Sequence, residues 1–212
     1  MIILDSEELI ALNSVIDNIP IYGLQLNDTD LNEEKRVIKT INSLKDKEIM
    51  FDGSFTDKGL AVLRLLELYK KNTIHIFINR LRIAPLDNEQ LIIIELKENN
   101  QFLISKTQKV TLEKKLILAI PYLQLPAKKR FIPFTISDMS KKDIENELND
   151  QKWRDILLIQ KHEENRTVLN KLYYMTENIG YCYDYILEAR VQKESFEIRI
   201  DLMDILEIGG GE

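Results

Sequence analysis

The chain has 212 residues, of which 44% are hydrophobic and 30% are charged, a balance typical of one globular domain or of two small ones. Its net charge of −6 disfavours binding to nucleic acid or to anionic membranes, because such binding depends on Lys and Arg neutralising phosphates. A single cysteine, Cys182, excludes an intramolecular disulfide, and the longest apolar runs, such as Leu116–Tyr122, are too short to span a bilayer. The first residues lack the basic region of a signal peptide, and we therefore expect a cytoplasmic protein that is not inserted in a membrane.

Three helices are predicted in the N-terminal third of the chain. The first runs from about Ser6 to Asp17, because its apolar residues recur at helical spacing. The second ends near Leu44, and one apolar stripe of this helix is expected to face the core: Leu31, Val37, Ile38, Ile41 and Leu44. After a turn at Asp52-Gly53, the third runs from about Asp57 to Lys71. Apolar residues occupy so much of its circumference that we expect it to be buried on more than one side.

From Thr73 the apolar pattern changes from a helical period to the alternation of a strand. Ile74, Ile76 and Ile78 alternate with other residues, and Pro85 ends this run. Short turns separate the strands that we expect in this part of the chain, which are 73–84, 90–96, 101–106 and 110–115. Strands joined in this way form an antiparallel meander.

The second half of the chain has a similar order of elements. A short helix is expected at 116–125, and a further helix runs from about Ser140 to Leu148. The strands expected there are 131–136, 153–160, 168–175, 181–189 and 196–200, and a helical turn at 202–208 follows. We therefore predict an α+β fold, in which an antiparallel β-sheet of two meanders is flanked by α-helices. The similar order of elements in the two halves leaves a pseudo-two-fold repeat open. The chain is interpreted as a single domain, 1–212, with halves at 1–120 and 121–208 and a tail at 209–212.

Residues that commonly carry catalysis or bind metals are few and scattered along the chain. His75 is expected to be a hydrogen-bonded strand residue and His162 a solvated shoulder of a hairpin. Cys182 has no base nearby in the sequence and is expected to be a small buried residue of a sheet. We therefore predict that the protein is not an enzyme and has no cofactor and no metal site, while a catalytic site assembled from distant residues stays open as an alternative.

Two features invite a nucleic-acid interpretation, and neither supports it. Lys128–Arg130 is a basic cluster with Phe131 and Phe134 beside it, but three charges and two aromatic rings are too few for a binding surface. The helices and hairpin at 31–96 have the order of a winged helix, but the helix Asp57–Lys71 is too apolar to lie in a groove of DNA. We expect no nucleic-acid partner.

Three stretches carry a family resemblance: DSEELIALNSVIDNIPIYGL, LKDKEIMFDGSFTDKGLAVLRLLELYKKNTIHIFI and QLIIIELKENNQFLISKTQKVTLEKKLILAIPYL. They resemble, in this order, an opening helix, a core of short helix, polar turn, capped helix and strand, and a hairpin followed by a strand and a short helix. This is the order of the EspG-type chaperones of type VII (ESX) secretion systems. The acidic Thr-Gly-Arg segment of the mycobacterial-type members is missing, so the chain is most similar to the Gram-positive, Bacillota-type branch, whose cargo differs.

The resemblance implies a single EspG-like domain that acts as a cytoplasmic chaperone or adaptor. Such a protein binds a helical secretion substrate encoded nearby and keeps it soluble and competent for export. Its cargo contacts come from a C-terminal helical region and from a loop between strands, which falls by position alone at Ala84, Pro85, Leu86 and Asp87; an ordinary hairpin loop is the alternative. A function from a different class, that of an immunity protein neutralising a secreted toxin, is motivated by the acidic balance of the chain.

Overall fold

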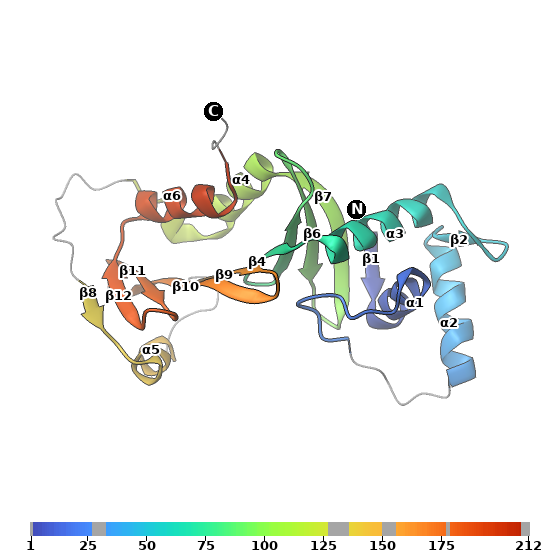
Figure 1. Ribbon diagram of the computed structural model, residues 1–212, viewed down its shortest axis with the longest axis horizontal. Helices are drawn as coiled ribbons and strands as arrows, with labels where there is room; N and C mark the ends of the chain where they lie inside the picture. The colour runs from blue at the N-terminus through green and yellow to red at the C-terminus, as the bar shows by residue number, and fades with distance from the viewer. Residues whose placement is uncertain (1, 27–32, 127–135, 150–155, 177–178, 209–212) are drawn as a thin grey trace. The chain divides into compact units, whose positions relative to one another are not determined.

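The computed structural model describes residues 2–26, 33–126, 136–149, 156–176 and 179–208 (Figure 1). The chain forms two compact units. Unit 1 comprises Met1–Asn72 and Arg80–Lys106, and unit 2 comprises Thr73–Asn79 and Thr107–Glu212. Both units combine antiparallel strands with helices, which confirms the predicted α+β class. The units do not coincide with the sequence halves 1–120 and 121–208, because Thr73–Asn79 groups with unit 2.

Four antiparallel strands of unit 1 lie in the order β1-β7-β6-β5. Their bounds are β1 (Ile2–Asp5), β5 (Leu81–Pro85), β6 (Gln90–Leu96) and β7 (Gln101–Gln108). The register places Ala84 opposite Ile92 and Ile83 opposite Ile93, and all four side chains are buried. Burial on both faces explains why β6, with the sequence QLIIIEL, is apolar at nearly every position.

Three helices and a small hairpin complete unit 1: α1 (Ser6–Ile16), α2 (Glu33–Asp46), β2 (Met50–Phe51), β3 (Ser54–Phe55) and α3 (Asp57–Lys71). Helix α3 buries Val62, Leu66 and Tyr69 in the same core cluster as Leu12 of α1. Leu60 of α3 is exposed, so the helix buries one broad face, which carries Val62, Leu66 and Tyr69, and turns the rest of its circumference toward water.

Helix α2 differs from the prediction of one buried apolar stripe. Leu44 is buried, but Val37, Ile38 and Ile41 are exposed. The helix turns the side that carries Thr40 and Leu44 inward, and its other apolar residues therefore face water. Leu31, which the prediction also included, lies outside the described residues.

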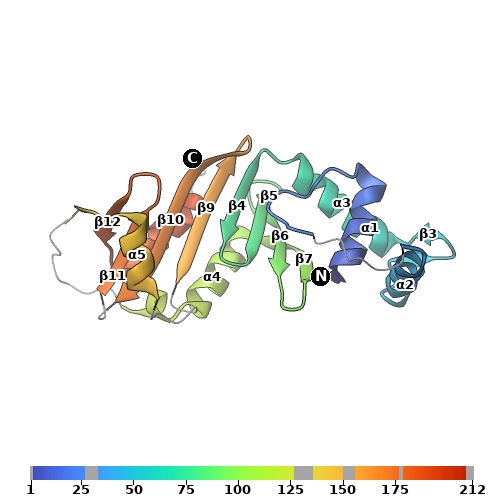
Figure 2. The same cartoon turned by 90° about the horizontal axis from the view of Figure 1, so that it is seen from below.

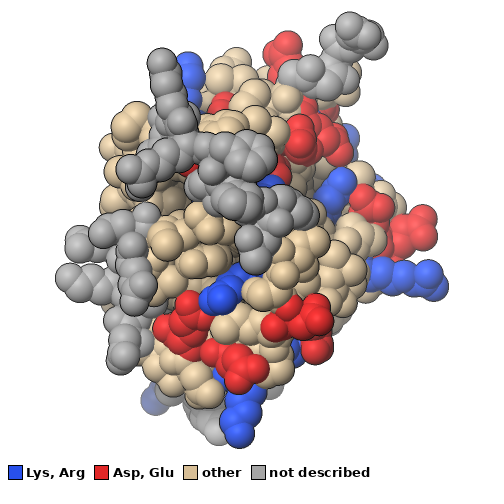
Figure 3. Space-filling model, turned by 90° about the vertical axis from the view of Figure 1, so that its left-hand side faces the viewer, with Lys and Arg blue, Asp and Glu red and all other residues tan. Residues whose placement is uncertain are grey.

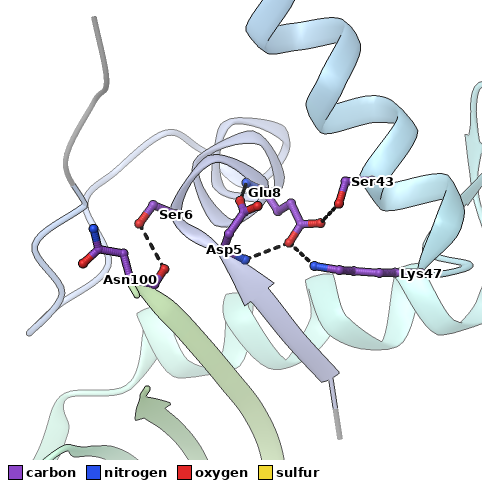
Figure 4. A network of polar contacts seen from close by, with 6 residues as sticks. All are labelled: Asp5, Ser6, Glu8, Ser43, Lys47 and Asn100. Carbon is purple, nitrogen blue, oxygen red and sulfur yellow. Dashed lines mark hydrogen bonds and ion pairs between the residues drawn. The ribbon is translucent and has the colours of Figure 1, made fainter. Parts of the chain in front are cut away.

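A buried carboxylate connects the start of α1 to α2 (Figure 4). Glu8 is fully buried, and its oxygen Oε2 accepts hydrogen bonds from the backbone N–H of Asp5 at 2.7 Å and from Nζ of Lys47 at 2.5 Å. Its oxygen Oε1 accepts a further hydrogen bond from the Ser43 hydroxyl at 2.6 Å. Asp5 in turn caps α1 by accepting the Glu8 N–H, which completes a capping box. All these partners are protein groups, so we interpret the cluster as a structural contact between α1 and the C-terminal end of α2.

The described residues of unit 2 form six antiparallel strands in the order β4-β9-β10-β11-β12-β8. Their bounds are β4 (Ile74–Ile78), β8 (Ile136–Asp138), β9 (Leu157–Glu163), β10 (Arg166–Thr176), β11 (Ile179–Asp184) and β12 (Ala189–Gln192). The β4–β9 register places His75 directly opposite His162, and both imidazoles are buried. The prediction that His162 is solvated was therefore wrong, because the hairpin shoulder that carries it is covered. Cys182 is buried in β11, as predicted.

Helices cover both faces of the unit 2 strands (Figure 1): α4 (Lys109–Ala119), the 3-10 helix η1 (Pro121–Gln124), α5 (Lys141–Leu148) and α6 (Ser195–Ile205). Helix α5 packs Ile144 against Leu172, Tyr174 and Tyr183, and Figure 2 shows this helix in front of β10 and β11. Helices α4 and α6 lie on the opposite face. Among the described residues, no helix combines the length and the apolar character needed to cross a membrane.

Two predicted strands are helical in the structure. The segment 110–115 belongs to α4, and the segment 196–200 belongs to α6. The predicted strand 73–84 divides into β4 and β5 at Asn79, which has a left-handed backbone with φ of 48°. The predicted strand 181–189 divides in the same way into β11 and β12. The extended segment expected at 131–135 and the start of the strand expected at 153–160 lie outside the described residues.

Candidate functional site

The residues that the resemblance places in contact with a partner lie at the end of β5 and in the turn that follows: Ala84, Pro85, Leu86 and Asp87. The Ala84 side chain is fully buried in the core of unit 1, and Leu86 packs against that core. Asp87 is exposed, and its Oδ1 accepts hydrogen bonds from the backbone N–H groups of Glu89 at 2.9 Å and Gln90 at 2.7 Å. These bonds shape the segment as a hairpin turn, in which Asp87 is the side chain most open to a partner.

The two histidines form part of a packed sheet face. Phe77 of β4 places its ring centroid 4.6 Å from that of His162, and the Thr167 hydroxyl lies 3.2 Å from Nδ1 of the same imidazole. Across the described part of the chain, no group of three or more His, Cys, Asp or Glu side chains is arranged to hold a metal ion. Two buried imidazoles surrounded in this way are explained by packing between strands.

A partly buried polar cluster anchors α6 to the strands beneath it. Oδ2 of Asp201 accepts hydrogen bonds from the Tyr173 hydroxyl at 2.9 Å and from Nζ of Lys193 at 2.6 Å. Cys182 lies opposite Tyr173 in the β10–β11 register, and burial raises the pKa of its thiol to about 11. The thiol is therefore protonated near neutral pH, and a protonated thiol is a poor nucleophile.

A hollow beside the N-terminus of α6 is too small for an ordinary ligand. Its volume is about 90 Å³, and its walls include Tyr122, Leu125, Met175 and Lys193. Pockets that hold cofactors or drug-sized molecules usually have volumes of about 300 Å³ or more. This hollow is well below that size.

Helices α4 and α6 are antiparallel neighbours on one face of unit 2 (Figure 1). At one end, Nζ of Lys109 in the first turn of α4 lies 3.6 Å from Oε2 of Glu207, just beyond the end of α6. At the other end lies Ser195, the first residue of α6. Its hydroxyl donates a hydrogen bond to the backbone oxygen of Leu125 at 2.7 Å. The segment formed by α4 and η1 therefore runs along the whole of α6 in the opposite direction.

Both helices bury one side and turn apolar side chains outward from the other. The buried residues recur at helical spacing and include Leu112, Leu116, Ile198, Leu202 and Ile205. The outward residues of the two helices, together with Leu125 directly after η1, define what we call the α4–α6 face: Val110, Leu118, Leu125, Phe196 and Ile200. Their exposed fractions range from 38% at Phe196 to 73% at Leu118. Large apolar side chains gathered on a surface are typical of sites that bind another protein.

Charges of opposite sign accompany the α4–α6 face. Lys114 and Lys115 are exposed on α4, whereas Asp204 and Glu207 are exposed on or next to α6. A partner helix lying along this face would therefore be oriented by its own charges as well as held by apolar contacts. On the separate face that Figure 3 shows, the basic side chains are interspersed with acidic and other residues and form no continuous basic area among the described residues.

The comparison with known families places this surface in a defined domain. A family model described as "Domain of unknown function (DUF5081)" matches residues 3–199 of the chain. The chain belongs to the DUF5081 family. No curated protein matches the chain. The match includes α4 and the first part of α6, so most of the α4–α6 face lies within the DUF5081 domain.

The α4–α6 face of the DUF5081 protein was missed in the sequence, because two segments that form it had been interpreted as strands. A signal for α6 was nevertheless present. Glu194 and Glu197 have the spacing of a capping box, and the structure shows both of its reciprocal hydrogen bonds. Phe196 and Ile200 are four residues apart, which places both on one side of a helix.

Proposed function

We propose that this DUF5081 protein is a non-enzymatic adaptor that binds a helical segment of another protein on its α4–α6 face. The observation that carries the proposal is the exposure of large apolar side chains on two antiparallel helices and at Leu125, which follows η1. A third helix packed along them would remove these side chains from water, which is the usual way in which an amphipathic helix is recognised.

Burial of these side chains by a partner would contribute favourable free energy. Complete burial of a fully exposed Leu, Ile or Phe side chain contributes about 1.5–3 kcal/mol, and each residue of the face would contribute the share of that value that its exposed fraction represents. The entropic cost of association offsets part of this gain. We expect a few central residues to contribute most of the remaining binding free energy. Leu118 and Ile200 are the best candidates, because they are the most exposed residues of their helices that belong to the face.

The resemblance to EspG-type chaperones supplies the class of partner. It leads us to propose that the helical segment belongs to a substrate of a type VII secretion system, encoded near this protein. Binding in the cytoplasm would shield the apolar surface of the substrate and keep it soluble and competent for export. The antiparallel sheets and the flanking helices are compatible with that role.

The test is co-expression of the full chain with small helical proteins encoded by neighbouring genes, followed by purification and measurement of the dissociation constant. We expect a 1:1 complex that the double variant Phe196→Glu and Ile200→Glu abolishes. The matched control is Ile186→Glu with Leu187→Glu, because these residues are also exposed and apolar but lie between β11 and β12. Failure to recover any complex would overturn the adaptor function, and equal binding by both double variants would overturn the site.

A further inference from the structure

The β2–β3 hairpin of unit 1 holds an aromatic side chain in water. Phe51 is 75% exposed, whereas its neighbours Met50 and Phe55 pack against the core of the unit. Asp52 and Gly53 join the two strands with φ angles of 47° and 78°, as a tight turn between antiparallel strands requires. Because successive side chains of a strand point to opposite faces, Phe51 points outward when Met50, its neighbour in β2, packs inward.

The base of this hairpin is fixed by backbone contacts. The Thr56 N–H donates to the Ile49 oxygen at 3.0 Å, and the Thr56 hydroxyl donates to the Glu48 oxygen at 2.6 Å. Ile49 is fully buried, and Gly59 of α3 approaches its carbonyl so closely that an added Cβ would lie 2.2 Å from the oxygen. A side chain presented by such a support loses little further freedom on binding, which favours its use as an anchor.

The segment that carries Phe51 has a small excess of acidic residues. Exposed carboxylates are present at Asp46, Glu48, Asp52 and Asp57, while Lys45 is exposed, Lys58 lies 3.3 Å from Glu48, and Lys47 pairs with Glu8. Carboxylates are repelled by the anionic surface of a membrane, so a lipid bilayer is a poor match for this hairpin. A protein pocket with an apolar floor and a rim of Lys or Arg matches both the ring and the charges.

We propose that the β2–β3 hairpin is a second docking element, which inserts Phe51 into an apolar pocket with a basic rim on a partner protein. The inference does not depend on the adaptor function proposed for unit 2, because the hairpin and its support lie wholly in unit 1. Aromatic residues are prominent among those that dominate binding energies at protein interfaces. The Phe51 side chain is exposed enough to enter such a pocket, and hydrogen bonds from Thr56 already fix the base of its hairpin.

The test uses the full chain with a photo-crosslinking phenylalanine analogue at position 51, expressed in the cells that naturally make the protein. The same analogue at Leu187, which is 73% exposed in unit 2, is the matched control. We expect a protein adduct specific to position 51, whose partner is then purified and titrated with the unmodified chain. Phe51→Ala should weaken that binding by about 30-fold or more, as expected for a dominant anchor.

Charge reversal provides a second measurement. The double variant Glu48→Lys and Asp52→Lys should also weaken binding to the identified partner and remove most of its dependence on salt. The absence of a specific adduct, an adduct with a second copy of this chain, or unchanged affinity of Phe51→Ala would overturn the proposal. Sedimentation with vesicles of phosphatidylcholine and phosphatidylglycerol that depends on Phe51 would overturn it in favour of a membrane. Circular dichroism of each variant verifies that it folds.

Discussion

Nζ of Lys47 lies 2.5 Å from Oε2 of Glu8, and this ion pair joins two helices that the sequence separates by a long connection. The Glu8 side chain is almost wholly removed from water, while the Lys47 side chain is about one-third exposed. A carboxylate in such a position is tolerated because hydrogen bonds from the Asp5 backbone and the Ser43 hydroxyl satisfy its other lone pairs. Oε2 also accepts the Asp5 N–H in the capping box of α1, so a single side chain specifies both the start of a helix and the position of its neighbour.

Glu8→Ala should lower the free energy of unfolding by about 2–4 kcal/mol, because it removes the carboxylate and leaves the Lys47 ammonium and the Ser43 hydroxyl without this acceptor. Glu48→Ala is the matched control. Its carboxylate also pairs with a lysine, Lys58, but its side chain is 82% exposed, so the change should be below about 1 kcal/mol. Urea denaturation followed by circular dichroism measures both values, and equal effects would contradict the structural role of Glu8.

Gly59→Ala should destabilise unit 1, although alanine is normally the better helix former. In a helix interior, alanine is more favourable than glycine by about 1 kcal/mol of intrinsic helix propensity. The new Cβ would, however, lie 2.2 Å from the backbone oxygen of Ile49, which cannot move aside as a side chain could. We expect a net loss of about 1–3 kcal/mol in unfolding free energy. Lys58→Ala, an exposed position in the same turn of α3, is the control, and a stabilised Gly59→Ala protein would refute the close approach.

The α+β class could be predicted from the sequence because most elements have a clear period. Isoleucines at 74, 76 and 78 alternate as a strand requires, and Thr56 caps α3 as expected. Buried Cys182 was also predicted correctly. In each case the local pattern and the tertiary environment favour the same structure.

The α4–α6 face could not be predicted because its local patterns are ambiguous. In Phe196–Ile200, the sequence FEIRI alternates perfectly as a strand would, yet the buried positions are Ile198, Leu202 and Ile205, at helical spacing. Phe196 and Ile200 are apolar although they are exposed, and together with Ile198 they produce an alternating pattern in the sequence. Exposed apolar residues can therefore hide the helical period of the buried ones.

The position of Phe51 illustrates the same problem. The Asp52-Gly53 pair was interpreted as a turn between helices, although this dipeptide is also the strongest short signal for a hairpin. The flanking strands contain only two residues each, too few to show an alternation. Ile49, directly before β2, and Gly59 of α3 are brought close together only by the fold.

Cys182 should react slowly with thiol reagents in the native protein. Burial raises the pKa of its thiol from a usual value of 9.0 to about 11, so the thiolate fraction at about pH 8 falls about 100-fold. We expect 5,5′-dithiobis(2-nitrobenzoate) to label the native chain at least about 100-fold more slowly than the chain unfolded in urea. Rapid labelling of the native chain would show that β11 is open to solvent.

The same shift predicts a loss of stability at alkaline pH. The native thiol holds its proton more tightly than the unfolded thiol. Its contribution to the free energy of unfolding is therefore fully present below about pH 9 and is lost as the pH rises toward about 11. Cys182→Ala should therefore reduce the fall in unfolding free energy across this range. A smaller fall should remain, because burial also raises the pKa of Tyr174 to about 12. An identical alkaline profile in Cys182→Ala would contradict the shift.

Arg190→Lys should loosen α5, although both residues carry a positive charge. Nη1 of Arg190 donates to the two carboxylate oxygens of Glu147 in α5 at 3.2 and 2.9 Å, and its guanidinium lies 4.7 Å from the centroid of the Tyr181 ring. A lysine ammonium cannot keep a planar group over the ring while it bonds to the carboxylate, so we expect a loss of about 1–2 kcal/mol.

Hydrogen exchange measured by mass spectrometry tests this loss, because weaker docking of α5 should speed the exchange of its backbone amides. Arg64→Lys is the control: this arginine also contacts a glutamate, Glu67, at 3.0 Å, but its side chain is 63% exposed and lies in unit 1. It should leave the exchange of α5 unchanged. If Arg190→Lys also left that exchange unchanged, the packing of Ile144 against Leu172, Tyr174 and Tyr183 would be sufficient to hold the helix without the ion pair.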